Sequence, residues 1–323
     1  MNKPSTFDAF AEHYLQHHRA LGRRYEREET IFASISCCLR AHAMTDLDQA
    51  GFDSWCQSLA HLSPNTLRNR QLTARKLCLF RRRTESDCFV PNPIRFARLV
   101  PYIAPVIFGP VEVARMLAAA AQLTAVSNSP LRPAVLRLAV VLLYTAGLRR
   151  GELLRLTLAD ADCAAGVLRV RESKFHKSRL VPLSPDARRE LRLYLRQRLA
   201  PPTSANPDSP LLCNCHDGVL RGYTGTGLSG GIQTLFRAAH VQSVDGRHPR
   251  VHDFRHSFAV QAMLRWYREG ADVQSNLPRL AMYMGHVSIV STAYYLKWVP
   301  ALAEAASHRF ETCFGDLING GKS

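Results

Sequence analysis

The stretch TAGLRRGELLRL, residues 145–156, joins the end of an apolar helix to a polar turn. Apolar residues dominate from Ala134 up to this stretch, which predicts a buried helix. Gly147 is placed to end that helix, because glycine readily adopts the left-handed conformation common at helix C-termini. Arg149 and Glu152 follow, three residues apart, so a new helix there would put both side chains on one face. This spacing is typical of a surface ion pair, and equally of a functional site in which a carboxylate holds an arginine in place.

Two short β patterns follow, VLRVR at 167–171 and RLVPL at 179–183, with a polar turn between them. Their length and their branched residues predict a small antiparallel hairpin. The turn carries Lys174 and Lys177. A lysine at a hairpin tip is usually only solvated, but it can also reach a DNA groove and donate a proton there. Helical patterns then resume at 186–199, 231–240, 253–268, 277–284 and 300–317.

The stretch VHDFRHSFAV, residues 251–260, places His252 and Arg255 on one face of a predicted helix. His256 follows His252 by four residues, close to the H-E-x-x-H pattern of zinc proteases. Two features argue against a metal. Asp253 stands where that pattern has glutamate and is one methylene shorter, and Arg255 puts a permanent cation between the two histidines. A metallohydrolase that uses His252 and His256 is therefore a minor alternative.

The stretch MGHVSIVSTAYYLK, residues 284–297, begins with another predicted helix end. Gly285 ends the helix, and His286 follows it directly. Tyr294 and Tyr295 come eight and nine residues after the histidine. A tyrosine in such a position is more often part of a core than a nucleophile, so the spacing by itself leaves both interpretations open.

Two further motifs are not typical of a cofactor or metal site. GTGLSG at 225–230 fits G-x-G-x-x-G, but we expect neither the preceding strand nor the later acidic residue of a dinucleotide fingerprint. We therefore predict a flexible loop there. Cys213, Cys215 and His216 lack a second pair of ligands, which makes zinc a weak interpretation. We expect neither a metal nor a cofactor.

Four helical patterns near the N-terminus predict a small helical domain; they lie at 7–21, 27–42, 52–59 and 64–80. Ser63 is a candidate cap of the fourth helix, and Pro64 suits its first position. This helix is crowded with basic side chains and has few acidic neighbours, so we expect it to face DNA phosphates. The candidate DNA-binding residues are Arg68, Arg70, Arg75, Lys76, Arg81 and Arg82.

Prolines crowd the region between residues 90 and 110, where they block helix formation and stiffen the chain. We therefore predict a helical DNA-binding domain at 1–90, a proline-rich linker at 91–109 and a second domain at 110–323. The second domain contains the β hairpin and ends in an amphipathic helix. The expected fold class is mainly α with a small antiparallel β-sheet, or α+β.

The charge balance favours a polyanionic partner. The 323 residues carry 42 Lys and Arg against 26 Asp and Glu, a formal net charge of +16, and DNA is the commonest polyanion. The N-terminal residues lack the apolar core of a signal peptide, and no apolar run approaches the roughly 20 residues of a membrane span. Nine cysteines show no disulfide-like framework. These features predict a cytoplasmic protein without a membrane partner.

Taken in order, the motifs resemble the catalytic domain of the tyrosine recombinase (phage integrase) family. GLRRGEL is similar to the family's first arginine box, and KFHKSRLVPL to its strand–turn–strand with the catalytic lysine. VHDFRHSFA is similar to its H-x-x-R box, and MGHVSIVSTAYYL to its G-H…Y box, whose nine-residue step selects Tyr295 over Tyr294. The N-terminal part resembles the family's core-binding domain only in size, helicity and charge. The implied catalytic residues are Arg149, Lys174, His252, Arg255, His286 and Tyr295. We expect Glu152 to support them by orienting Arg149 and His252 and not to react itself.

The resemblance implies a site-specific recombinase or integrase of a mobile element, with an Xer-like two-domain architecture. Such an enzyme cuts and rejoins double-stranded DNA through a covalent 3′-phosphotyrosyl link, without metal, ATP or another cofactor. It also implies a homotetramer on DNA, joined through the helix at 300–317, with room for accessory proteins. Two alternatives stay open: a type IB topoisomerase, which uses the same tyrosine chemistry as a monomer, and a non-catalytic DNA-binding regulator.

Overall fold

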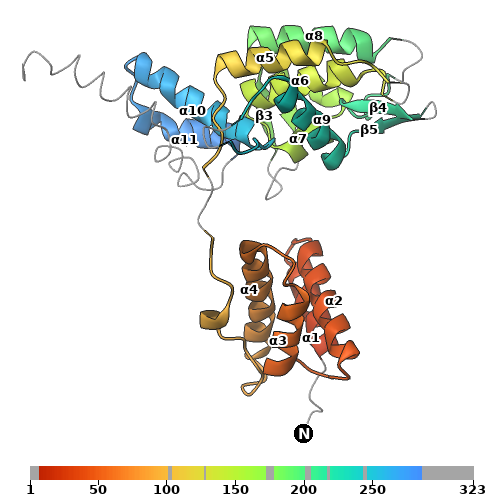
Figure 1. Cartoon of the computed structure of the whole chain (residues 1–323), viewed down its shortest axis with the longest axis vertical. Coiled ribbons are helices and arrows are strands. Elements are labelled where there is room, and N and C mark those ends of the chain that lie inside the picture. The colour runs from red at the N-terminus through yellow and green to blue at the C-terminus, as the bar shows by residue number, and fades with distance from the viewer. Residues whose placement is uncertain are drawn as a thin grey trace, which may run out of the picture. The chain divides into compact units, whose positions relative to one another are not determined.

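The computed structural model describes residues 7–100, 104–126, 129–171, 178–200, 205–216, 219–242 and 246–285. The chain divides into two compact units, residues 1–103 and 104–323 (Figure 1). Each unit has its own hydrophobic core, as is usual for domains that pack independently.

Four helices build the N-terminal unit: α1 (Phe7–Ala20), α2 (Glu26–Ala41), α3 (Gln49–Ser58) and α4 (Pro64–Arg81). They pack together in Figure 1, and the fully buried Trp55 lies in their common core. The side chain of Ser63 accepts a hydrogen bond from the backbone N–H of Thr66, and Pro64 occupies the first turn of α4. The helix therefore begins where its cap and proline predict.

The segment that follows α4 is fastened to it by hydrogen bonds from arginine side chains to backbone carbonyls. Arg75 donates to the carbonyl of Pro91, and Arg68 donates to that of Ala97 at 3.0 Å. A short 3-10 turn, η1 (Pro93–Arg95), lies between these two contacts. The start of the segment expected as a linker is therefore packed on the N-terminal unit.

The second unit is mainly helical. Its helices are α5 (Pro110–Ala121), α6 (Arg132–Thr145), α7 (Arg150–Arg155), α8 (Pro185–Arg198), α9 (Gly225–Ala238), α10 (Asp253–Arg268) and α11 (Val273–Met284), with a 3-10 turn η2 (Leu158–Asp160). Helix α6 is central, since it contacts α5, α8, α9 and α10, and most of its residues are buried. Residues 138–143 are all buried, so this part of α6 is covered on every side.

The described residues of the second unit also form two small antiparallel sheets. The first contains β1 (Ala161–Asp162), β2 (Val167–Val170) and β3 (Arg179–Pro182) in that order, and the second is the hairpin of β4 (Cys213–His216) and β5 (Val219–Gly222). The predicted class, mainly α with small antiparallel β structure, is confirmed. The β4–β5 hairpin and the short helix α7 were not predicted, because neither has a long periodic pattern.

The glycine-rich segment 225–230 is the start of α9, so the prediction of a flexible loop was wrong. The side chain of Thr224 caps this helix by accepting the N–H of Gly227 at 3.0 Å, and β5 ends shortly before it. A Cβ on Gly231, in the next turn, would lie 2.6 Å from Cδ2 of Leu136 on α6. Close packing of two helices therefore accounts for glycine at that position.

The helix expected at 300–317 lies outside the described residues. Among the helices that are described, none combines the length and the apolar content needed to cross a membrane.

Replacing Gly231 with alanine tests the close packing of α9 on α6. The added methyl group collides with the fully buried Leu136, so we expect the second unit to lose about 1–3 kcal/mol of unfolding free energy. Gly230→Ala is the matched control, because its Cβ would meet open space and helix propensity should add up to about 1 kcal/mol. Chemical denaturation followed by circular dichroism measures both variants. Equal effects would contradict the packing.

Candidate active site

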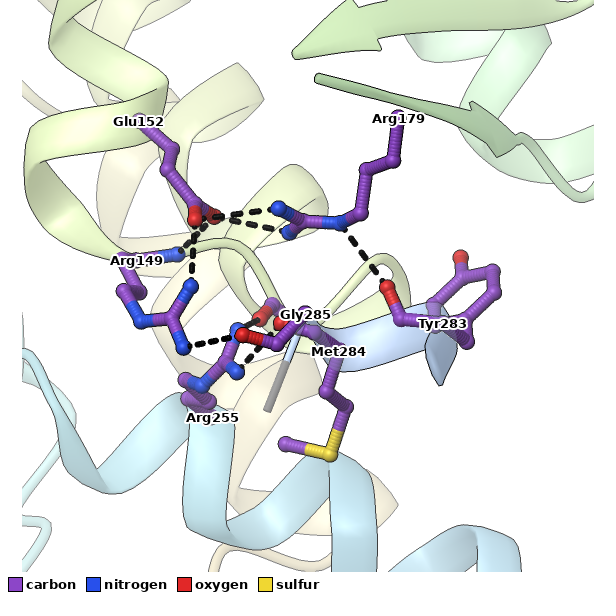
Figure 2. A network of polar contacts seen from close by, with 8 residues as sticks. Arg149, Glu152, Arg179, Arg255, Tyr283, Met284 and Gly285 are labelled. Carbon is purple, nitrogen blue, oxygen red and sulfur yellow. Dashed lines mark hydrogen bonds and ion pairs between the residues drawn. The ribbon is translucent and has the colours of Figure 1, made fainter. Parts of the chain in front are cut away.

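The carboxylate of Glu152 is the centre of a polar network at the start of α7 (Figure 2). Its side chain is only 1% exposed. One oxygen, Oε2, accepts the backbone N–H of Arg149 at 3.0 Å, as a glutamate in the first turn does when it caps its own helix. The other, Oε1, accepts Nη1 of the Arg149 side chain at 2.6 Å. The same carboxylate thus caps the helix and fixes the arginine.

A second arginine, Arg179 at the start of β3, reaches the same carboxylate (Figure 2). Its Nη1 donates to Oε1 at 3.0 Å and its Nη2 to Oε2 at 2.8 Å, a bidentate pair. Its Nε donates to the carbonyl of Tyr283 on α11 at 2.9 Å. Arg179 was not among the predicted site residues. The available signal was its place in the strand: it shares a face with the buried Val181, and a charge that points inward needs a partner.

The network holds more positive than negative charge. Burial alone would raise the pKa of Glu152, but hydrogen bonds from Arg179 and Arg149 outweigh it and lower that pKa to about 2. The carboxylate is therefore ionised at neutral pH and faces two guanidinium groups. Arg149 is the more accessible of them, with 24% of its side chain exposed against 12% for Arg179. A net positive charge beside an accessible arginine suits an anion such as phosphate.

A third guanidinium, that of Arg255, enters the site from α10. Its side chain is buried. Nη1 donates to the carbonyl of Gly147 at 2.6 Å, and Nη2 donates to that of Met284 at 2.5 Å. Arg255 thus joins the turn that follows α6 to the end of α11.

The C-terminal end of α11 is where the three arginines meet. The carbonyls of residues 283–285 accept hydrogen bonds from Arg179, Arg255 and Arg149 in turn, with Arg149 Nη2 at 2.8 Å from the last of them. These carbonyls have no partner within the helix and carry its partial negative charge, so they stabilise nearby cations. Gly285 has φ +68°, the left-handed conformation that glycine adopts most readily.

His252 stands at the N-terminal boundary of α10, and its side chain is exposed. Partial desolvation of the ring, and then the positive charge of Arg255, lower the pKa of His252. The imidazole is therefore mostly neutral at physiological pH and can accept a proton. The rings of His252 and His256 are nearly perpendicular, with centroids 4.8 Å apart. Within the described part of the chain, no three His, Cys, Asp or Glu residues gather as metal ligands would.

The structure brings Arg149, Glu152 and Arg255 together, with His252 close enough to sense the charge of both arginines. We expected Glu152 to orient both Arg149 and His252. Among the described residues its hydrogen bonds go to Arg149 and Arg179, so the expectation was wrong for His252. The predicted site residues that lie outside the described ranges are Lys174, His286 and Tyr295.

The basic residues of α4 differ in their surroundings. Arg81 is buried and pairs with Asp46 at 2.6 Å and with Glu85 at 2.7 Å. These ion pairs stabilise the helical unit, so the prediction that Arg81 binds DNA was wrong. Asp46, which is distant in sequence, supplies the charge that local composition did not show. Arg68 and Arg75 already donate to backbone carbonyls. Among the other candidates Lys76 and Arg82 are exposed and Arg70 is half-buried, and Arg82 also donates to the carbonyl of Cys88 at 3.3 Å.

Comparison with known proteins identifies the family. Residues 111–299, more than half of the chain, match the phage integrase family. The putative integrase/recombinase y4rB of Sinorhizobium fredii (strain NBRC 101917 / NGR234) is 31% identical over 327 residues, covering 97% of this chain and 99% of that protein. The tyrosine recombinase XerC of Chromobacterium violaceum is 31% identical over 155 residues, 48% of this chain and 45% of that one. The chain therefore belongs to the phage integrase family of tyrosine recombinases, which are site-specific recombinase enzymes.

Solved structures have the same fold. The integrase of transposon Tn1549, in complex with a circular intermediate DNA, aligns with a TM-score of 0.64 at 17% identity, over 95% of this chain and 99% of that one. The site-specific recombinase XerH, bound to a palindromic difH substrate, aligns with a TM-score of 0.59 at 19% identity, over 82% and 71%. The predicted architecture, a helical N-terminal region followed by an integrase catalytic domain, is confirmed.

Replacing Glu152 with glutamine tests whether its charge holds the network. The amide keeps the shape but leaves two largely buried guanidinium groups without a carboxylate, so we expect a loss of about 3 kcal/mol of unfolding free energy at pH 6. The loss should be smaller at pH 3. A carboxyl whose folded pKa falls from 4.5 to about 2 contributes stability that is complete above the first value and disappears towards the second.

Denaturant unfolding at the two pH values measures this difference. Asp186→Asn is the control, because Asp186 forms a solvent-exposed pair with Arg189 and should contribute little. A loss for Glu152→Gln that is the same at pH 6 and pH 3 would contradict a role for its charge.

Proposed function

We propose that this protein is a site-specific recombinase or integrase that cuts and rejoins double-stranded DNA through a covalent 3′-phosphotyrosyl link to Tyr295. One observation carries the proposal: Arg149 and Arg255 come from different helices and donate to consecutive carbonyls, beside the buried Glu152. Two guanidinium groups so arranged suit the non-bridging oxygens of one phosphate. Membership in the phage integrase family supports the same chemistry.

In the proposed reaction, the hydroxyl of Tyr295 attacks phosphorus and displaces the 5′-oxygen of the next nucleotide. Arg149 and Arg255 bind the non-bridging oxygens and stabilise the charge that develops on them. In the structure these arginines donate to backbone carbonyls. A phosphate oxygen carries more negative charge than a carbonyl oxygen, so it is the stronger acceptor and can replace it.

Proton transfer involves three further residues. His252 is mostly neutral at physiological pH because its pKa is lowered, so it can take the proton of Tyr295. Lys174 protonates the leaving 5′-oxygen and His286 hydrogen-bonds the phosphate; both roles rest on the family motifs in which these residues occur. The phosphotyrosyl link retains the energy of the broken bond, so rejoining needs neither ATP nor metal.

The proposed partner is double-stranded DNA at specific sites. A net charge of +16 favours binding to its phosphates, and the accessible Lys76 and Arg82 on α4 are candidate contacts. Among the structural relatives, the Tn1549 integrase is bound to a circular intermediate DNA and XerH to a difH substrate. We further propose a role in a mobile element and a homotetramer on DNA, joined through the helix expected at 300–317.

A nicked DNA library tests the nucleophile. The probe is a pool of duplexes of randomised sequence, each with one nick, so that cleavage near the nick releases a short strand and traps the protein on DNA. We expect the wild-type protein to form a covalent adduct in the presence of EDTA, visible on a denaturing gel. Tyr295→Phe should lower the adduct to background, whereas the neighbouring Tyr294→Phe should retain it.

Other outcomes identify the alternatives. An adduct that persists in Tyr295→Phe would contradict the assignment of the nucleophile. Cleavage that EDTA abolishes would indicate a metallohydrolase. Trapped DNA without any common sequence would indicate a type IB topoisomerase, and DNA binding without an adduct would indicate a regulator.

A further inference from the structure

We infer that Arg179 is a positioning residue for strand cleavage: it fixes Glu152, so that Glu152 holds Arg149 in place for the phosphate. The inference rests on the proposed function, and it gives a role to a residue of KFHKSRLVPL to which the sequence analysis assigned none. Arg179 comes from β3, whereas Arg149 and Glu152 both come from the start of α7. It therefore joins two parts of the chain that local structure does not connect.

All three guanidinium nitrogens of Arg179 donate to acceptors within the protein. Nη1 and Nη2 bind the two oxygens of Glu152 at 3.0 and 2.8 Å, and Nε binds the carbonyl of Tyr283 at 2.9 Å. Its side chain is less exposed than that of Arg149. Arg149 contacts Glu152 through one nitrogen of its guanidinium and the carbonyl of Gly285 through another. Arg179 is therefore the supporting member of the pair, and Arg149 is the member that can exchange a carbonyl for a phosphate.

Arg179 fixes the position of the Glu152 carboxylate. Glu152 is buried, and an ionised carboxylate in such a place is costly unless each oxygen has hydrogen-bond donors. With Arg179 present, each oxygen accepts one bond from Arg179 and one from Arg149. Without it, half of these bonds are lost and the carboxylate can rotate. Arg149 would then keep its charge but lose its fixed position.

The end of α11 shows how closely the two arginines are packed. A Cβ on Gly285 would lie 2.9 Å from Nη1 of Arg179 and 3.5 Å from Nη1 of Arg149. The absence of a side chain there lets both guanidinium groups approach the same helix end. Because Arg179 also donates to the carbonyl of Tyr283, its side chain connects β3, α7 and the end of α11. Lysine can replace it only in part, since an ammonium group keeps the charge but cannot span two carboxylate oxygens and a carbonyl.

Single-turnover cleavage of a nicked duplex recovered from the trapped library tests this role. We expect Arg179→Gln to lower the rate of adduct formation at saturating DNA by about 100-fold, because a displaced catalytic group costs about that much. Arg179→Lys should be intermediate. The affinity for DNA of both variants should stay close to that of the wild type. Arg179→Gln removes half of the hydrogen bonds to the buried carboxylate, so it should lower the thermal midpoint, and rates are compared at a temperature at which circular dichroism shows each variant to be folded. Arg169→Gln is the matched control, because Arg169 is exposed on the adjacent strand β2, opposite Leu180.

A double-mutant cycle separates positioning from a direct role. If Arg179 acts through Glu152, adding Arg179→Gln to Glu152→Gln should lower the rate much less than it does in the wild type. Multiplicative losses would overturn the inference, as would a wild-type rate in Arg179→Gln. The inference would also be overturned if unfolding or weaker DNA binding fully accounted for the loss of rate in both Arg179→Gln and Arg179→Lys. A wild-type protein that forms no adduct would overturn the proposed function, and this inference with it.

Discussion

The buried carboxylate of Glu152 is the constraint on which the rest of the site depends. An ionised group in the interior costs several kcal/mol unless its oxygens are satisfied, and here two arginines from separate elements satisfy them. Arg149 lies on the same helix end, so its position follows from local structure. Arg179 lies on β3, so β3 must lie within reach of Glu152 for the charge to be tolerated. Folding and the arrangement of the site are therefore coupled through one ion pair network.

Two helix ends give this network its geometry. Gly147 follows α6 and Gly285 follows α11, both with a positive φ, and the carbonyls around them turn towards the arginines. The cations are thereby stabilised by the negative ends of helices. In the proposed reaction, the phosphate of DNA would replace these carbonyls as the acceptor, so the positive charges would already be gathered. Such preorganisation lowers the cost of gathering positive charge around a reacting phosphate.

The sequence allowed the local features to be predicted but not those that depend on contacts between distant segments. The cap at Ser63, the main helices and the pairing of Arg149 with Glu152 follow from spacing and residue type. Arg179 was missed because its partner lies 27 positions away and only the folded sheet brings them together. Arg81 was assigned to DNA for the same reason, since its partner Asp46 is 35 positions away. The first turns of α9 were predicted as a loop because glycine has a low helix propensity, which the cap from Thr224 and the packing of the helix on α6 override.

The central claim is that Arg149 and Arg255 bind the phosphate that is cut. A structure of the Tyr295→Phe variant bound to a DNA duplex recovered from the trapped library tests this claim directly. We expect the non-bridging oxygens of one phosphate within about 2.7–3.0 Å of both guanidinium groups, with Glu152 still held by Arg179. A scissile phosphate bound by other side chains, with both arginines still on the carbonyls of residues 284 and 285, would contradict it.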